Sequence, residues 1–201
     1  MGDSPSKYNE PLQPQVQPVW FTEARFCSAQ EVTLHLREKI FSFSGDDFKI
    51  KDPHTGQEWF QVKGSALSLR DKKVLSDVYG AAILTISEKL LSFSPTFTLY
   101  RGDSDQQELC KVLARRTFAK AKMSATVVNC HTGVPMPISL KARGDLRTKA
   151  CVVYIGEAKQ GGHPIAKDYY VTIAPNVDAA FVVALCVCLD ELSEDGGRLG
   201  R

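Results

Sequence analysis

Apolar and polar residues alternate along short stretches of this chain, and turn residues separate the stretches about every ten positions. Such alternation predicts strands with one buried face. It is clearest in Val32–Leu36, Phe48–Lys51, Ile83–Ile86, Phe97–Tyr100 and Tyr170–Ile173. Turn residues lie in Asp52–Gly56, Tyr79–Gly80, Arg101–Asp103, His131–Gly133 and Gly161–Pro164. The pattern is typical of an all-β sandwich or barrel.

An internal repeat supports a single sheet. Ile40–Ser44, followed by Phe48, recurs as Leu90–Ser94, followed by Phe97. A period of about fifty residues indicates a duplicated supersecondary unit. Since neither copy can cover its own apolar face, we expect the two copies to form one sheet, whose closure into a barrel removes exposed edges.

One segment near the C-terminus breaks the alternation, because Ala179–Leu189 is apolar at every position. Asn176 is a candidate N-cap and Asp178 would lie in the first turn, so we predict a helix over about residues 177–192. A helix that is apolar on all sides is buried or spans a membrane. The apolar run would extend about 17 Å, short of the roughly 30 Å hydrocarbon core, so we expect burial inside the barrel.

The ends of the chain are polar and rich in helix and strand breakers. Residues 1–18 contain four prolines and three glutamines, and residues 194–201 are polar and glycine-rich. Such segments bury too little apolar surface to become ordered. We therefore predict disordered tails over 1–18 and 194–201, and one domain over 19–193.

The N-terminus lacks the basic and apolar regions of a secretory signal, which predicts a cytoplasmic protein that is not secreted. Peripheral association with the plasma membrane and a nuclear location remain alternatives. The six cysteines form no CxxC pair, so we expect free thiols. Gly2 and Ser6 match the loose myristoylation pattern, although Asp3 is an unfavourable neighbour.

Charge is nearly balanced, at +2 overall, but it is unevenly distributed. Between Glu108 and Asp145 there is no acidic residue, and the same window holds several lysines and arginines. Two interpretations are open: a solvated strand face, or a site for an anionic headgroup. The residues we select for the headgroup site are Arg115, Arg116, Lys120 and Lys122. We expect no nucleic-acid partner, since no basic stripe is interleaved with aromatic residues.

Catalytic and metal-binding patterns are missing from the sequence. No serine or cysteine has a recognisable nucleophile context, Cys130 and His131 would point to opposite faces of a strand, and Cys186 and Cys188 would lie about 200° apart on a helix. We predict no catalytic residues, no metal and no cofactor. The pairs Trp20–Phe21 and Trp59–Phe60 are expected to belong to the core.

Several longer motifs make the chain resemble the plant LURP-one-related family, whose fold is similar to the tubby C-terminal domain and the phospholipid scramblases. The motifs are Phe60–Gly64, Leu75–Asp77, Leu99–Gly102, Ala150–Glu157 and Val171–Phe181. The resemblance implies a mainly β fold: a closed twelve-stranded antiparallel barrel around a central apolar C-terminal helix. It also implies a link to pathogen defence for some relatives, and phosphoinositide binding through surface lysines and arginines for tubby-like barrels.

The scramblase likeness further implies calcium binding before the C-terminal helix. Here Asp168 is the one carboxylate in residues 167–173, too few for a calcium site. The leading hypothesis is a monomeric, non-enzymatic module that binds a phosphoinositide headgroup or an unknown protein partner. The alternatives are a barrel enclosing a lipid ligand and a tubby-like transcriptional regulator.

Overall fold

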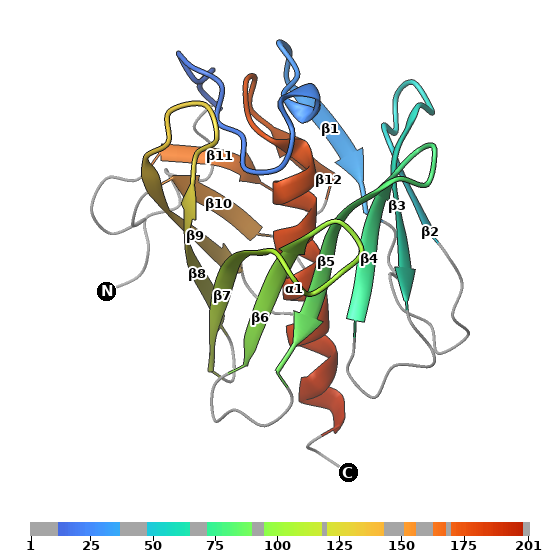
Figure 1. Cartoon of the computed structure of the whole chain (residues 1–201), viewed down its shortest axis with the longest axis vertical. Helices are drawn as coiled ribbons and strands as arrows, with labels where there is room; N and C mark the ends of the chain where they lie inside the picture. The colour runs from blue at the N-terminus through green and yellow to red at the C-terminus, as the bar shows by residue number, and fades with distance from the viewer. Residues whose placement is uncertain are drawn as a thin grey trace.

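The sheet wraps around one long C-terminal helix (Figure 1). The computed structural model describes residues 12–36, 48–64, 72–89, 95–117, 120–142, 151–155, 163–167 and 170–198. Within these residues the fold is mainly β, with one large antiparallel sheet and one α-helix. The expected mainly β fold, with an antiparallel sheet and one C-terminal helix, is therefore confirmed.

All neighbouring strands of the sheet run antiparallel. The strands of the first half are β1 (Val32–His35), β2 (Phe48–Lys51), β3 (Glu58–Gly64), β4 (Lys72–Asp77), β5 (Ala82–Glu88) and β6 (Thr96–Arg101). Those of the second half are β7 (Glu108–Thr117), β8 (Lys120–Val128), β9 (Pro135–Ala142), β10 (Cys151–Ile155), β11 (His163–Lys167) and β12 (Tyr170–Ile173). Each of the five stretches with clear alternation contains a strand.

Side chains on the face toward the helix are buried, whereas the other face carries many polar side chains and some apolar ones, such as Leu113 and Val152. In β1, Val32 and Leu34 are buried while Thr33 and His35 are half-buried. The same alternation holds along β8, where Met123 is buried and Ser124 is exposed. The alternation of apolar and polar residues in the sequence therefore indicates which face of each strand contacts the helix.

The sheet order runs from β1 through β12 and down to β2, which lies beside β1 again. The contact between β1 and β2 consists of a single pair, His35 with Lys51, whereas β1 and β12 share four pairs. The residues that connect the two strands, 37–47, lie outside the described residues. Closure of the barrel therefore stays a prediction.

The internal repeat also falls largely outside the described part of the chain. Ile40–Ser44 and Leu90–Ser94 are not described. The phenylalanine that follows each copy does lie in a strand, since Phe48 begins β2 and Phe97 is fully buried in β6.

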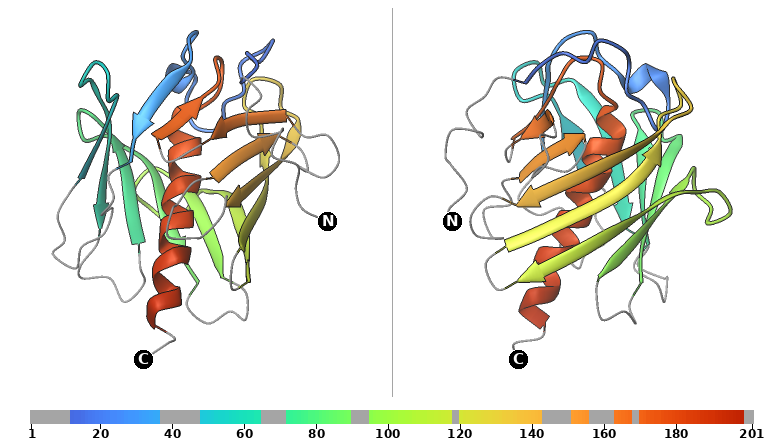
Figure 2. Two further views of the ribbon diagram at one scale, coloured as in Figure 1. Left: turned by 180° about the vertical axis from the view of Figure 1, so that it is seen from behind. Right: turned by 90° about the vertical axis from the view of Figure 1, so that its left-hand side faces the viewer.

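The helix α1 spans Ala179–Arg198 and lies along the inside of the curved sheet (Figure 2). Every residue from Ala179 to Asp190 is buried. The prediction of a helix in this region is confirmed, although the helix spans Ala179–Arg198 rather than about 177–192. The helix also includes residues 194–198, which the sequence analysis placed in a tail.

The N-terminal segment crosses the end of the sheet where α1 begins. Val19 forms a parallel bridge with Val177, and the Gln15 N–H donates to the Pro175 carbonyl at 3.2 Å. Leu12 is buried in the core. Residues 12–18, which the sequence analysis assigned to a disordered tail, make these contacts, whereas residues 1–11 lie outside the described part.

Candidate functional site

A row of three cations crosses the outer face of β7, β8 and β9. Arg115 pairs with Lys122, and Lys122 pairs with Lys141 on its other side. These strands face the viewer in the right-hand panel of Figure 2. The adjacent residues Ala114 and Leu140 are buried toward α1, so the three cations belong to the opposite, outer side of the sheet.

The three cations, which we call the cationic row, lie directly opposite one another. Residues opposite each other in an antiparallel pair have Cβ atoms about 4.5–5.5 Å apart, and like charges there destabilise the sheet. Arg115 is exposed, and Lys122 and Lys141 are half-buried. None of the three forms an ion pair with another described residue. An anion bound across the row would remove this repulsion.

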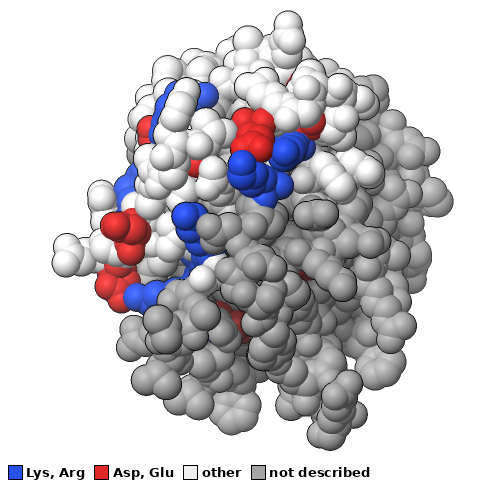
Figure 3. Space-filling model, turned by 90° about the vertical axis from the view of Figure 1, so that its right-hand side faces the viewer, with Lys and Arg blue, Asp and Glu red and all other residues white. Residues whose placement is uncertain are grey.

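Several cations elsewhere on the sheet are neutralised by nearby carboxylates. The Glu58 carboxylate oxygens lie 2.9 Å from the Lys49 Nζ and 3.0 Å from the Lys51 Nζ. The Lys72 Nζ lies 2.9 Å from the Asp105 Oδ2. Figure 3 shows the side of the molecule on the right of Figure 1, where blue and red atoms lie next to each other. The cationic row differs because its three cations lie opposite one another and none has a carboxylate partner within the described residues.

The structure brings together two of the four residues selected from the sequence, Arg115 and Lys122. Arg116 follows Arg115 in β7 and lies opposite Ala121 rather than in the row, and Lys120 lies opposite Thr117. The side chains of Arg116 and Lys120 lie outside the described part. Lys141 was not selected, because the sequence alone does not reveal which residue of β9 lies opposite Lys122.

A second charged cluster lies inside the sheet, near the lower half of α1 in Figure 1. Lys73 of β4 is buried and forms an ion pair with Glu191 of α1. Asp190 beside it is also buried. Lys73 shares its face of β4 with Leu75, so this charge points toward the helix rather than toward solvent. The pair fixes the helix against the strand.

A third polar cluster lies where α1 begins. The fully buried Asp178 accepts hydrogen bonds from the Phe181 N–H at 3.1 Å and from the Phe21 N–H at 2.9 Å. Thr22 donates two more, from its N–H and its hydroxyl. Burial raises the pKa of the Asp178 carboxyl, and these hydrogen bonds partly oppose that rise. Asp178 is thus the N-cap of the helix, and the expectation that Asn176 would cap it was wrong.

Asn176 has a different role from the predicted cap. Its backbone lies in the left-handed region, with φ at 64°, and its side-chain amide donates to the Gln15 carbonyl at 2.8 Å. Asparagine tolerates this conformation better than most residues. It therefore turns the chain from β12 into α1 while holding the N-terminal segment.

The described cysteine side chains are free thiols. Burial raises the pKa of Cys110 to about 12, with a smaller contribution from Glu108, and burial likewise raises that of Cys27 to about 12, helped by Asp178. Burial also raises the pKa of Cys188. A thiol with so high a pKa has almost no thiolate near neutral pH, so these cysteines are poor nucleophiles and metal ligands.

Of the two aromatic pairs expected in the core, Phe21, Phe60 and Trp59 belong to it, whereas Trp20 is half-buried outside the core cluster. Phe21 and Phe60 are fully buried, and the Phe21 ring packs against Phe181 with centroids 4.6 Å apart. Trp59 is partly buried against the same core. These residues therefore do not form an exposed aromatic patch.

Among the described residues, none of the helices has the length and apolar character needed to cross a bilayer. This finding agrees with the burial of α1 within the sheet, where strand side chains cover its apolar surface. The same residues also contain no cluster of three or more histidine, cysteine, aspartate or glutamate side chains suited to a metal ion.

Comparison with known proteins places the chain among plant relatives. A family described as LURP-one-related matches residues 32–190. Protein LURP-one-related 15 of Arabidopsis thaliana is 28% identical over 86% of this chain and 85% of its own length. Protein LURP-one-related 10 of the same organism is 29% identical over 85% of this chain and 94% of its own length. An X-ray structure of another Arabidopsis thaliana protein superposes with a TM-score of 0.61 at 26% identity, covering 86% of this chain and 98% of that one.

Proposed function

Since this chain belongs to the LURP-one-related family, we propose that it is a non-enzymatic binding module that takes a phosphate-bearing headgroup on the outer face of β7, β8 and β9. We propose further that the sheet closes into a barrel, that the protein works at the cytoplasmic side of the plasma membrane, and that it shares the link to defence of some relatives.

The cationic row carries this proposal. Arg115, Lys122 and Lys141 lie in register on three adjacent strands without a described carboxylate partner. A sheet that places like charges opposite one another loses stability. Charged residues that only keep a strand face soluble do not need to lie opposite one another, so solubility alone does not explain the row. Phosphate oxygens would accept hydrogen bonds from all three side chains and remove the repulsion.

The interior supports surface binding over an enclosed ligand. Side chains of α1 and of the inward strand faces belong to one buried apolar cluster. The helix itself fills the space that a lipid would occupy in a ligand-enclosing barrel. For this reason we place the ligand on the outer face.

Co-sedimentation with lipid vesicles tests the proposal. The variant Arg115→Ala, Lys122→Ala, Lys141→Ala removes the row, and the control Lys49→Ala, Lys51→Ala, Lys63→Ala removes three cations from β2 and β3. A cation near an anionic leaflet contributes about 1 kcal/mol, so we expect about a hundredfold weaker binding to phosphoinositide vesicles for the first variant. The control should bind nearly as the wild type does. Equal binding by the first variant and the wild type would contradict the proposal.

A further inference from the structure

The face that carries the cationic row also presents aliphatic side chains to solvent. Leu113 is 55% exposed and precedes Arg115 by two positions on β7, so both point outward. Val128 at the end of β8 is 49% exposed, and Val134 in the following turn is 56% exposed. Leu113 and Val128, two of the large exposed apolar residues in the described chain, thus lie on the same face as the cationic row.

This face contains almost no negative charge. Glu108 is the one carboxylate in β7, β8 and β9, and its side chain lies 3.6 Å from the Lys111 Nζ. Among the other outward residues near the row, Ser124 and Thr126 of β8 are exposed, whereas Ser139 of β9 is buried. Cations, hydroxyl groups and isolated aliphatic side chains on a carboxylate-poor face match the chemistry of an anionic lipid surface.

The composition favours a lipid surface over an acidic protein. None of the three strands contains an aromatic residue, whereas centres of protein interfaces are enriched in tyrosine and tryptophan and depleted in lysine. Two of the three cations in the row are lysines. Lysine serves as a point charge for phosphate and is also common on peripheral membrane surfaces.

We propose that the outer face of β7, β8 and β9 lies against an anionic bilayer, with Leu113 entering the interface beside Arg115 while the cationic row contacts lipid phosphates. This inference rests on the proposed function and narrows it to a bilayer rather than a free phosphate compound. Leu113 adds affinity that only a membrane can provide, because a soluble headgroup has no acyl region to receive it.

Two binding measurements on the full-length chain test the role of Leu113. The first uses vesicles of phosphatidylcholine, phosphatidylserine and phosphatidylinositol bisphosphate, and the second uses soluble inositol trisphosphate in a calorimeter. For Leu113→Ser we expect about fivefold weaker vesicle binding, since roughly half of a leucine side chain would be withdrawn from the interface, with unchanged binding of inositol trisphosphate. Leu113→Trp should strengthen vesicle binding.

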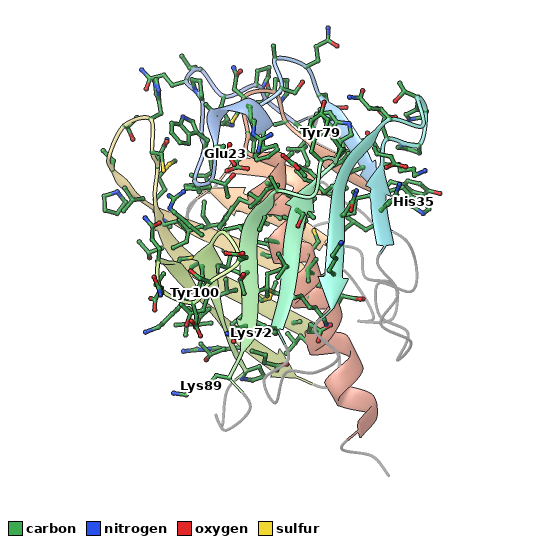
Figure 4. All side chains as sticks on the ribbon, turned by 45° about the vertical axis from the view of Figure 1, so that its right-hand side comes forward. Glu23, His35, Lys72, Tyr79, Lys89 and Tyr100 are labelled. Carbon is green, nitrogen blue, oxygen red and sulfur yellow. The ribbon has the colours of Figure 1, made fainter. Side chains whose placement is uncertain are left out.

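The matched control is Tyr79→Ser. Tyr79 is 90% exposed in the turn between β4 and β5, away from the strands that carry the row (Figure 4). This variant should bind vesicles as the wild type does. Weaker vesicle binding by Tyr79→Ser would mean that removing an exposed side chain far from the cationic row also weakens binding.

The outcomes separate this inference from the proposed function. If Leu113→Ser binds vesicles as the wild type does while the cationic-row variant is weakened, the membrane contact of Leu113 is refuted and headgroup binding stands. If the cationic-row variant also matches the wild type, both fail. Capture of an acidic protein through the row, without vesicle binding, would likewise overturn the bilayer assignment.

Discussion

The Asp178 Oδ2 accepts hydrogen bonds from both the backbone N–H and the hydroxyl of Thr22, each at 2.7 Å, although the two residues are 156 positions apart. The same carboxylate caps α1 through the Phe181 N–H. One fully buried side chain therefore joins the N-terminal segment to the start of the helix. Arg101 strengthens the junction by donating to the Phe21 carbonyl at 2.7 Å.

Replacing Asp178 with alanine should greatly reduce stability. The substitution leaves buried donors of Phe21, Thr22 and Phe181 without their acceptor, at a cost of about 3–5 kcal/mol in the free energy of unfolding. Urea unfolding followed by circular dichroism measures this loss. Thr22→Val removes a single hydroxyl donor and should cost about 1 kcal/mol. Equal effects of the two substitutions would mean that Asp178 does not organise this junction.

The buried ion pair between Lys73 and Glu191 should show strong coupling between its partners. Lys73→Met leaves Glu191 as a buried charge without its lysine, and we expect a loss of about 3 kcal/mol. The double variant Lys73→Met, Glu191→Leu should regain most of that loss, because two apolar side chains replace the pair. A double-mutant cycle in urea provides the measurement. Additive losses from the two single substitutions would contradict the pairing.

Asp77 should contribute stability that depends on pH. Burial acts to raise the pKa of this carboxyl, but hydrogen bonds from Arg25 and from the N–H groups of Ala81 and Tyr79 outweigh burial and hold the pKa below its ordinary value of 3.8. A carboxyl whose pKa is lower in the folded state stabilises the fold above its unfolded pKa, and this stability is lost as the pH falls through the folded value.

The variant Asp77→Asn tests that dependence. At neutral pH we expect it to be less stable than the wild type by about 2 kcal/mol, because hydrogen bonds to a charged acceptor are lost. The difference should shrink as the pH falls below about 3.8. Unfolding free energies measured between pH 2 and pH 7 would show this convergence; a difference that stays constant with pH would disprove the role of the ionised carboxylate.

The sequence reveals the strands and the helix because burial imposes a visible period on each. Alternation along Val32–His35 places every second residue against α1, and the continuous apolar run from Ala179 predicts a helix buried on all sides. The end of α1 was harder to predict. The apolar run stops at Leu189, but the helix continues to Arg198, because backbone hydrogen bonds continue a helix beyond its apolar residues.

Long-range pairing explains what the sequence could not reveal. The window between Glu108 and Asp145 identified Arg115 and Lys122, but only the register of β8 with β9 adds Lys141. Lys73 was similarly overlooked, although it has the same parity as the buried Leu75 in β4. That parity is a usable signal for an inward charge, but it does not identify Glu191 as the partner.

The central claim is that the outer face of β7, β8 and β9 receives a phosphorylated headgroup. An NMR titration of the labelled protein with inositol trisphosphate tests it residue by residue. We predict the largest amide shift changes around Arg115, Lys122 and Lys141, with little change along β2 and β3. Shift changes confined to β2 and β3, or no changes at saturating ligand, would contradict the account.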